Sequence, residues 1–205
     1  MTEKEKMISG QIYDPNDEEL LILRRKAHKL SKLYNDTLED EVERREEFLN
    51  ELLPNHGIGT YLQGPVYFDY GAFTKVGKNF YSNFNFTVLD VCPVTIGDNV
   101  FVGPNVSILT PKHPLRWQER NIYKSEKGYF TDKEYGAPVT IGDNCWIAGN
   151  VTICAGAKIG AGCVIGAGSV VTGEISENSL AYGNPCRVVR KITEADITDI
   201  NKEHI

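Results

Sequence analysis

The four histidines are the side chains best suited to proton transfer, because a neutral imidazole titrates near about pH 6.5. His28 lies in a region of helical spacing, His56 in a linker and His204 in the C-terminal tail. His113 precedes Pro114 where a regular pattern gives way to an irregular stretch, which is a natural rim for a functional site. Taken alone, a His-Pro pair at the start of a loop is more often structural than catalytic.

The five cysteines include no Cys-x-x-Cys pair, and their odd number argues against a disulfide framework. No histidine or basic motif marks any of them as a reactive thiol. Four scattered histidines also provide no three-histidine set for zinc, so we predict no metal site. The cysteines are Cys92, Cys145, Cys154, Cys163 and Cys186.

The charge and the apolar content of the chain argue against several classes of protein. The 205 residues carry a net charge of −6, which argues against a general nucleic-acid binder. The N-terminus lacks the apolar region of a signal peptide, and no apolar stretch approaches the ~18 residues that span a membrane. We therefore expect a cytoplasmic protein with no nucleic-acid or membrane partner.

A six-residue period organises the C-terminal half of the chain. A chain that turns a corner every six residues, with one aliphatic side chain pointing inward each time, produces this pattern. Three such sides close a triangular coil of about eighteen residues, and stacked coils bury a continuous aliphatic column. A small inward residue follows four places after each aliphatic one, and Gly or Asn takes the corner between. The aliphatic positions are Ile96, Val102, Ile108, Ile141, Ile147, Ile153, Ile159, Ile165 and Val171.

The remaining segments interrupt or flank the coils. The stretch 114–138 has no period and is too long for an ordinary connection, so it predicts a projecting functional loop. Residues 17–53 have apolar residues at helical spacing and predict two amphipathic helices. We expect an N-terminal helical cap with acceptor-site residues over 1–56, a parallel β-helix over 57–190 and a tail over 191–205. Residues 187–196, across the boundary between these last two parts, predict a strand and a short helix that close the other end of the coil.

Several motifs resemble one family over nearly the whole chain. They are GQIYDPNDEEL, PVYFDYG, NFYSNFNFTVLDVCPVTIGDNV, the pair His113-Pro114 and GNPCRVVRKI. The chain resembles the maltose/galactoside O-acetyltransferase family of hexapeptide-repeat acyltransferases. This resemblance implies a mainly β protein, a left-handed parallel β-helix. It also implies a homotrimer with active sites between subunits, acetyl-CoA as donor and a sugar hydroxyl as acceptor.

The resemblance assigns His113 as the general base that activates the sugar hydroxyl. Because no activated Ser or Cys lies beside His113, we expect direct transfer without an acyl-enzyme.

The resemblance also assigns the residues that bind the acceptor. Three of these residues have structural alternatives. Tyr81 could be a packing residue, Asn83 could form a tight corner of the coil, and Asp17 could be a helix N-cap. Asp14 or Asp17 substitutes for a family aspartate where this chain has Pro15. The implied acceptor residues are Asp14, Asp17, Arg24, Asp69, Tyr81, Asn83, Asp90 and Glu134.

Cofactor contacts are implied along the regular coils. Gly149 stands where some members have a serine, so a backbone N–H must serve any oxyanion there. Gly173 replaces a frequent lysine, which leaves arginines for the phosphates of CoA. The alternative for these arginines is a solvated basic tail. The implied positions are Asn83, Gly149, Ala167, Thr172, Arg187 and Arg190, with Lys191 as a further cation.

Two other functions remain open at this stage. One is acetylation of a xenobiotic such as an antibiotic, by an enzyme with the same fold and a catalytic histidine. The other is a β-helix scaffold without enzymatic activity, because a fold alone does not establish a function.

Overall fold

The computed structural model describes residues 1–198, so His204 and residues 199–205 of the expected tail lie outside the described part. Three helices form the N-terminal segment: α1 (Glu3–Ile8), α2 (Glu18–Asn35) and α3 (Val42–Leu52). The two helices predicted within 17–53 are thus present as α2 and α3, and α1 was not predicted. Thr2 caps α1 through a capping box, and Asp17 caps α2 by accepting from the Glu19 N–H.

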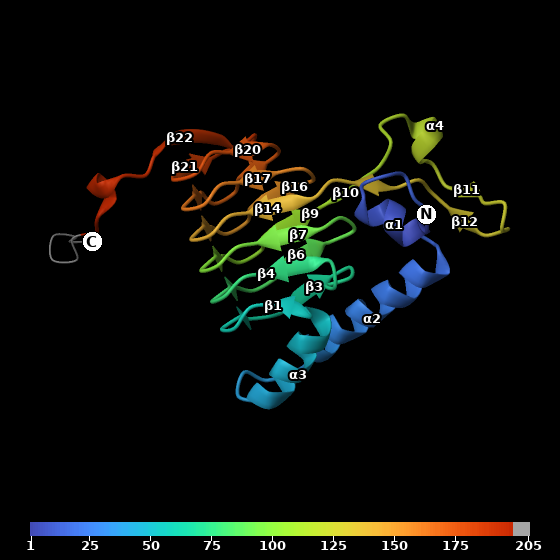
Figure 1. Cartoon of the computed structure of the whole chain (residues 1–205), viewed down its shortest axis with the longest axis horizontal. Coiled ribbons are helices and arrows are strands. Elements are labelled where there is room, and N and C mark those ends of the chain that lie inside the picture. Colours follow the sequence, from blue (N-terminus) through green and yellow to red (C-terminus); the bar gives the residue numbers. More distant parts are fainter. Residues whose placement is uncertain (199–205) are drawn as a thin grey trace.

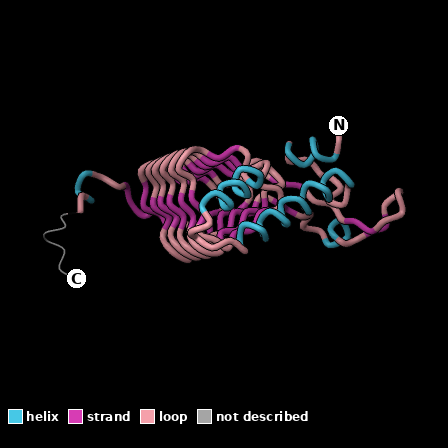
Figure 2. The backbone as a smooth tube through the Cα atoms, turned by 90° about the horizontal axis from the view of Figure 1, so that it is seen from below, coloured by secondary structure: helices cyan, strands magenta, loops and turns pink. Residues whose placement is uncertain are grey.

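The body of the molecule is a parallel β-helix with three sheets, as Figures 1 and 2 show. The first sheet contains β1 (Asn55–His56), β4 (Thr74–Val76), β7 (Val94–Ile96), β14 (Val139–Ile141), β17 (Lys158–Ile159) and β20 (Glu174–Ile175). The second contains β2 (Tyr61–Leu62), β5 (Tyr81–Ser82), β8 (Phe101–Val102), β15 (Trp146–Ile147), β18 (Val164–Ile165), β21 (Ser179–Tyr182) and β22 (Arg187–Lys191). The third contains β3 (Val66–Phe68), β6 (Phe86–Leu89), β9 (Ser107–Leu109), β16 (Thr152–Cys154) and β19 (Val170–Val171).

The six-residue repeat positions the core as predicted. Ile96, Ile141 and Ile159 are in register on one sheet, so each repeat adds one aliphatic layer to a buried column. The corners use asparagine at positive φ, including Asn99 and Asn144, whose side chains also hydrogen-bond to each other at 3.3 Å. The mainly β fold class is therefore confirmed.

The outer faces of the three sheets differ in character. The first sheet presents a polar column of Lys75, Thr95, Thr140, Lys158 and Glu174 in register. The second presents an aromatic column, which we define as Tyr61, Tyr81, Phe101 and Trp146. Phe101 and Trp146 leave 55% and 54% of their surface exposed, which is unusual for adjacent large apolar side chains on a monomer.

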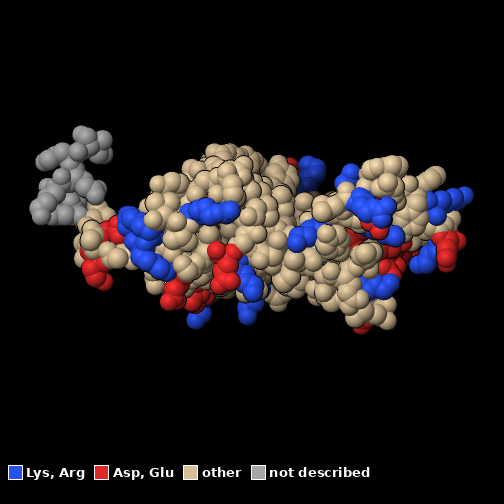
Figure 3. Space-filling view, turned by 90° about the horizontal axis from the view of Figure 1, so that it is seen from above, with Lys and Arg blue, Asp and Glu red and all other residues tan. Residues whose placement is uncertain are grey.

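Both ends of the coil are covered. In Figure 1, α2 and α3 lie against the end that begins with β1, and β22 lies at the opposite end. There β22 pairs antiparallel with β21 and is followed by the short helix η1 (Glu194–Asp196), as predicted. Basic and acidic side chains lie together at this C-terminal end (Figure 3). Within residues 1–198 we find no helix with the length and apolar character needed to cross a membrane.

The predicted loop projects from the coil between β9 and β14. Strand β10 (Pro111–Lys112) leads into it and pairs antiparallel with β13 (Tyr135–Gly136), which leads back. Between them lie α4 (Trp117–Arg120) and a hairpin of β11 (Tyr123–Lys124) and β12 (Phe130–Thr131). Figure 1 shows the loop on the side of the coil where α1 and the N-terminus lie.

Candidate active site

His113 lies at the base of the projecting loop, directly after β10. Strand pairing fixes its surroundings. Lys112 is opposite Tyr135, and because the strands are antiparallel, the residue after Lys112 comes near the residue before Tyr135. That places His113 beside Glu134. Asp132 lies two residues before Glu134, and alternate residues of an extended segment share one face. The imidazole is 43% exposed, so it remains accessible at the rim.

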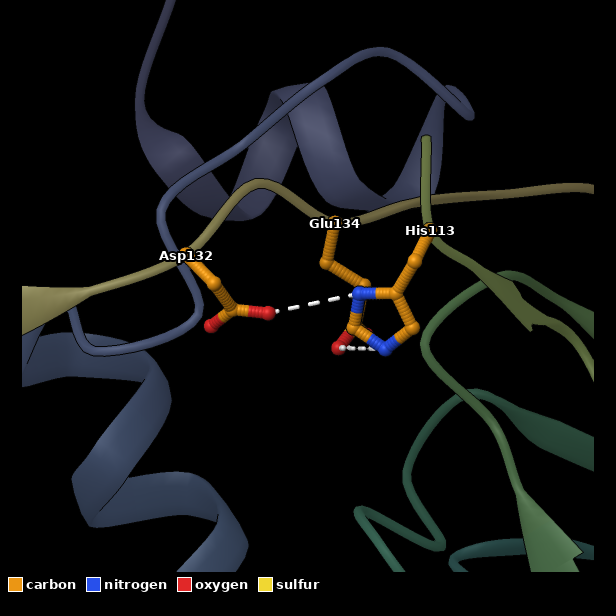
Figure 4. Close-up of side chains that lie close together, drawn as sticks. All are labelled: His113, Asp132 and Glu134. Atoms are coloured by element: carbon orange, nitrogen blue, oxygen red, sulfur yellow. Dashed lines mark ion pairs between the residues drawn. The ribbon is translucent and has the colours of Figure 1, made fainter. Parts of the chain in front are cut away.

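The two imidazole nitrogens have different partners (Figure 4). Nδ1 of His113 is 3.3 Å from Oδ2 of Asp132 and 3.3 Å from the carbonyl oxygen of Lys133. The Lys133 carbonyl can only accept a hydrogen bond, so Nδ1 carries the proton of the neutral ring, with the Asp132 carboxylate within ion-pair distance of it. Nε2 is then left with its lone pair, 3.8 Å from Oε2 of Glu134. This tautomer is the one that a general base requires.

Glu134 is largely withdrawn from solvent. Burial raises the pKa of its carboxyl above the usual range, and the hydrogen bond from the Tyr13 phenol and the charge of His113 oppose that effect in part. Asp132 and Asp69 add negative charge nearby and raise the pKa further. Glu134 is thus held beside His113, and its contact with the acceptor stays a prediction.

Asp69 and Arg24 lie near the same cluster. Asp69 follows β3, and its Oδ1 is 3.4 Å from Nε2 of His28. Burial raises the pKa of the Asp69 carboxyl, while His28 and the charge of Arg24 lower it. Of the predicted acceptor residues, Asp69, Arg24 and Glu134 therefore share one electrostatic environment with His113.

Asp90 cannot bind a sugar hydroxyl directly, contrary to the expectation. Its side chain is 0% exposed in the isolated chain. Its Oδ1 accepts from the Tyr70 N–H at 2.8 Å and its Oδ2 from the Thr74 hydroxyl at 2.9 Å. Both oxygens are used inside the coil, so Asp90 is a structural carboxylate.

Asp14 and Asp17 are also engaged within the protein. Asp14 accepts from the Thr131 hydroxyl and the Tyr129 phenol, both at 2.5 Å, and thereby fastens the loop hairpin. Burial opposes ionisation of Asp14, but these hydrogen bonds lower its pKa overall. Asp17 is the N-cap of α2, the alternative role considered for it.

Tyr81 and Asn83 lie on the second sheet, away from the loop. Tyr81 stacks on Tyr61 with ring centroids 6.0 Å apart, and Oδ1 of Asn83 accepts from the Phe84 N–H. Within the part of the chain that the structure describes, no hydrogen bond or ion pair connects either residue to His113. One chain alone does not bring these two residues to the base.

The implied cofactor positions lie on the later coils and the tail. Ala167 and Thr172 are exposed, and Gly149 is half-buried at a corner. In residues 1–198 the Gly149 N–H donates no hydrogen bond. Arg187 donates to the Cys186 carbonyl, and Arg190 forms two hydrogen bonds with Asp196 at 2.6 and 2.8 Å.

Sequence reasoning missed Asp132, Tyr13 and the Lys133 carbonyl. The alternation in Asp-Lys-Glu was a usable signal, because an extended segment presents both carboxylates to one side. It also missed that His113, Asp132 and Glu134 bring ligand atoms within 4.8 Å of one another, a donor set that could hold a cation. The expectation of a metal-independent enzyme stays a prediction.

Comparison with known proteins identifies the family of the chain. Residues 6–57 match the maltose acetyltransferase hexapeptide capping motif, residues 138–173 the bacterial transferase hexapeptide (six repeats) and residues 93–110 the hexapeptide repeat of succinyl-transferase. Galactoside O-acetyltransferase from Escherichia coli is 38% identical, with 94% of this chain and 90% of that protein covered.

Solved structures give the same result. A maltose O-acetyltransferase from Clostridium difficile 630 has a TM-score of 0.87 at 49% identity, covering 95% of this chain and 99% of that chain. A galactoside acetyltransferase in complex with coenzyme A has a TM-score of 0.87 at 39% identity, covering 96% and 94%. The chain is therefore an acetyltransferase that belongs to the maltose/galactoside O-acetyltransferase family.

Proposed function

We propose that this protein transfers an acetyl group from acetyl-CoA to a sugar hydroxyl, with His113 as the general base. One observation supports the proposal: Nδ1 of His113 pairs with the Lys133 carbonyl and lies 3.3 Å from Asp132, which leaves Nε2 as the basic atom of an imidazole that is 43% exposed. An imidazole held in this way can accept a proton from a bound alcohol.

The reaction follows from this arrangement. Nε2 of His113 takes the hydroxyl proton as the sugar oxygen bonds to the thioester carbonyl carbon. The tetrahedral intermediate then collapses and the carbon–sulfur bond breaks. The CoA sulfur takes the proton from His113 and leaves as the free thiol. Asp132 stabilises the imidazolium and fixes its orientation. No acyl-enzyme is required, because no serine or cysteine is hydrogen-bonded to His113 among the described residues.

Acetyl-CoA as the donor is supported by relatives. The galactoside acetyltransferase above was solved with coenzyme A, and a hexapeptide-repeat acetyltransferase from Vibrio cholerae was solved with acetyl coenzyme A. On this chain the N–H of Gly149 is available to stabilise the oxyanion. Ala167, Thr172 and Arg187 are exposed along the same end of the coil. Arg190 would have to exchange Asp196 for phosphate.

A homotrimer would complete the site. The aromatic column is an exposed apolar surface that a second subunit could bury, whereas the polar column is suited to water. In such an assembly Tyr81 and Asn83 of one subunit would approach His113 of its neighbour. This would give those two residues the acceptor role that they lack in a single chain.

The test is release of CoA thiol from acetyl-CoA in the presence of maltose, glucose, galactosides or an antibiotic alcohol. We expect release with a sugar, unchanged by a chelator, and a fall of roughly a hundredfold or more in kcat for His113→Ala with unchanged acetyl-CoA affinity. Release with the antibiotic alone would favour the xenobiotic alternative. Absence of acetyl-CoA binding would favour the scaffold. Near-normal turnover of His113→Ala would show that His113 is not the general base.

A further inference from the structure

The N-terminal segment reaches the active site through Tyr13. Its backbone N–H donates to the Glu134 carbonyl at 2.9 Å, and the two residues form an isolated antiparallel bridge. The Tyr13 phenol donates to Oε1 of Glu134. Tyr13 is 3% exposed and packs in a small apolar cluster with Met7, Leu20 and Cys92. Its ring is therefore fixed by packing, and so is the direction of its hydroxyl.

This contact divides the two oxygens of Glu134 between two partners. Oε1 accepts from Tyr13, and Oε2 lies 3.8 Å from Nε2 of His113. Holding one oxygen of a planar carboxylate restricts rotation about the side chain and so places the other oxygen. Burial raises the pKa of the Tyr13 phenol, which keeps it protonated and able to donate.

We propose that Tyr13 is a positioning residue that acts through Glu134, holding Oε2 where it stabilises the imidazolium formed on His113. The inference rests on the proposed function, because it concerns the proton that His113 takes from the acceptor. It assigns the N-terminal segment a direct part in setting the catalytic geometry. Tyr13 itself does not touch the reacting atoms.

Tyr129 provides a control for a purely structural role of Tyr13. The Tyr129 phenol donates to Asp14 and connects the same N-terminal segment to the loop hairpin, and among residues 1–198 it forms no hydrogen bond with Glu134 or His113. Tyr13→Phe and Tyr129→Phe each remove one phenol hydroxyl from a hydrogen bond between the N-terminal segment and the loop. Only the first should alter the base.

The measurement is steady-state kinetics with the sugar that wild type accepts. We expect Tyr13→Phe to lower kcat by about tenfold, the usual consequence of losing a hydrogen bond to a charged group, with KM for acetyl-CoA unchanged. Tyr129→Phe should stay within about twofold of wild type. Equal losses in the two variants would overturn the inference and indicate that Tyr13 only attaches the N-terminal segment to the loop. Full activity of Tyr13→Phe would also overturn it.

The pH dependence of kcat/KM supplies a second measurement, which a purely structural role of Tyr13 would leave unchanged. The charged groups facing Glu134 are His113, Asp132 and Asp69, with Arg24 of α2 beside Asp69. The Tyr13 hydrogen bond lowers the pKa of Glu134, so its loss must raise that pKa. The acidic limb of kcat/KM should move to higher pH in Tyr13→Phe and stay in place in Tyr129→Phe.

A double-mutant cycle isolates the pathway through Glu134. In a Glu134→Ala background, Tyr13→Phe should cause no further loss of kcat, because the group it positions is gone. Additive losses would contradict action through Glu134. Wild-type activity and the His113→Ala loss are measured in the same assay, so failure of the proposed function is distinguished from failure of this inference.

Discussion

Asp90 is a buried carboxylate whose ionisation should be visible in stability. Burial raises its pKa to about 6, although the N–H groups of Tyr70 and Gly71 and the Thr74 hydroxyl favour the charged form. The folded protein therefore holds this proton at pH values where the unfolded chain has lost it. Its contribution to stability is complete below about pH 4 and is lost as the pH rises through about 6.

Replacing Asp90 with Asn removes this titration. Between about pH 4.5 and pH 7, we expect the free energy of unfolding of wild type to fall by roughly 2 kcal/mol relative to Asp90→Asn. Urea unfolding of both proteins at one protein concentration measures the difference at each pH. A gain of the wild type over the variant with rising pH would show that the carboxyl ionises easily in place.

At the scale of elements, Gly71 sets how closely the helical segment approaches the coil. It has a φ of +67°, and a Cβ added there would lie 2.1 Å from the carbonyl oxygen of Leu52 at the end of α3. Neither backbone can yield without moving the helix from the first coils. The contact therefore allows only glycine.

Gly71→Ala should lower the free energy of unfolding by more than about 2 kcal/mol, from strain at positive φ and from the clash. Gly173→Ala is the matched control, because nothing lies within 4 Å of a Cβ at Gly173. We expect that control to stay within about 0.5 kcal/mol of wild type. Denaturant unfolding compares the two variants, and equal stabilities would mean that α3 adjusts freely.

At the scale of the whole molecule, the character of the three faces predicts how copies associate. The aromatic column is exposed on one face, and the polar column occupies another. A cyclic trimer needs a contact between two different faces of neighbouring subunits, which leaves a third face for solvent. The aromatic column is suited to one side of such a contact, and the polar column is suited to the face left for solvent.

If the proposed trimer forms through the aromatic column, Trp146→Glu should convert it to smaller species, because the substitution places a charge on that apolar surface. Thr140→Glu adds the same charge to the polar column and should leave the assembly intact. Sedimentation of both variants beside wild type gives the answer. A monomeric wild type would contradict the assembly itself, and a trimeric Trp146→Glu would place the interface elsewhere.

The sequence by itself determined the coil, because a six-residue period is a local property and each repeat carries its own inward residue and corner. The spacing of Ile141, Ile147 and Ile153 is therefore enough to assign their side chains to the core. His113 could be selected because it stands where that period stops. The left-handed sense was implied by resemblance alone, and superposition on relatives at a TM-score of 0.87 requires the same hand as theirs.

Only the tertiary structure decided which polar groups surround the base. Tyr13 and Glu134 are 121 residues apart, and no local pattern indicates that an N-terminal phenol and a loop carboxylate meet. The same limit explains Asp90. The family resemblance implied a sugar contact for it, whereas its burial and its two internal donors give it a structural role. A residue type indicates what chemistry is possible, but burial and distant partners fix which chemistry occurs, and both arise from contacts between segments that are far apart in the chain.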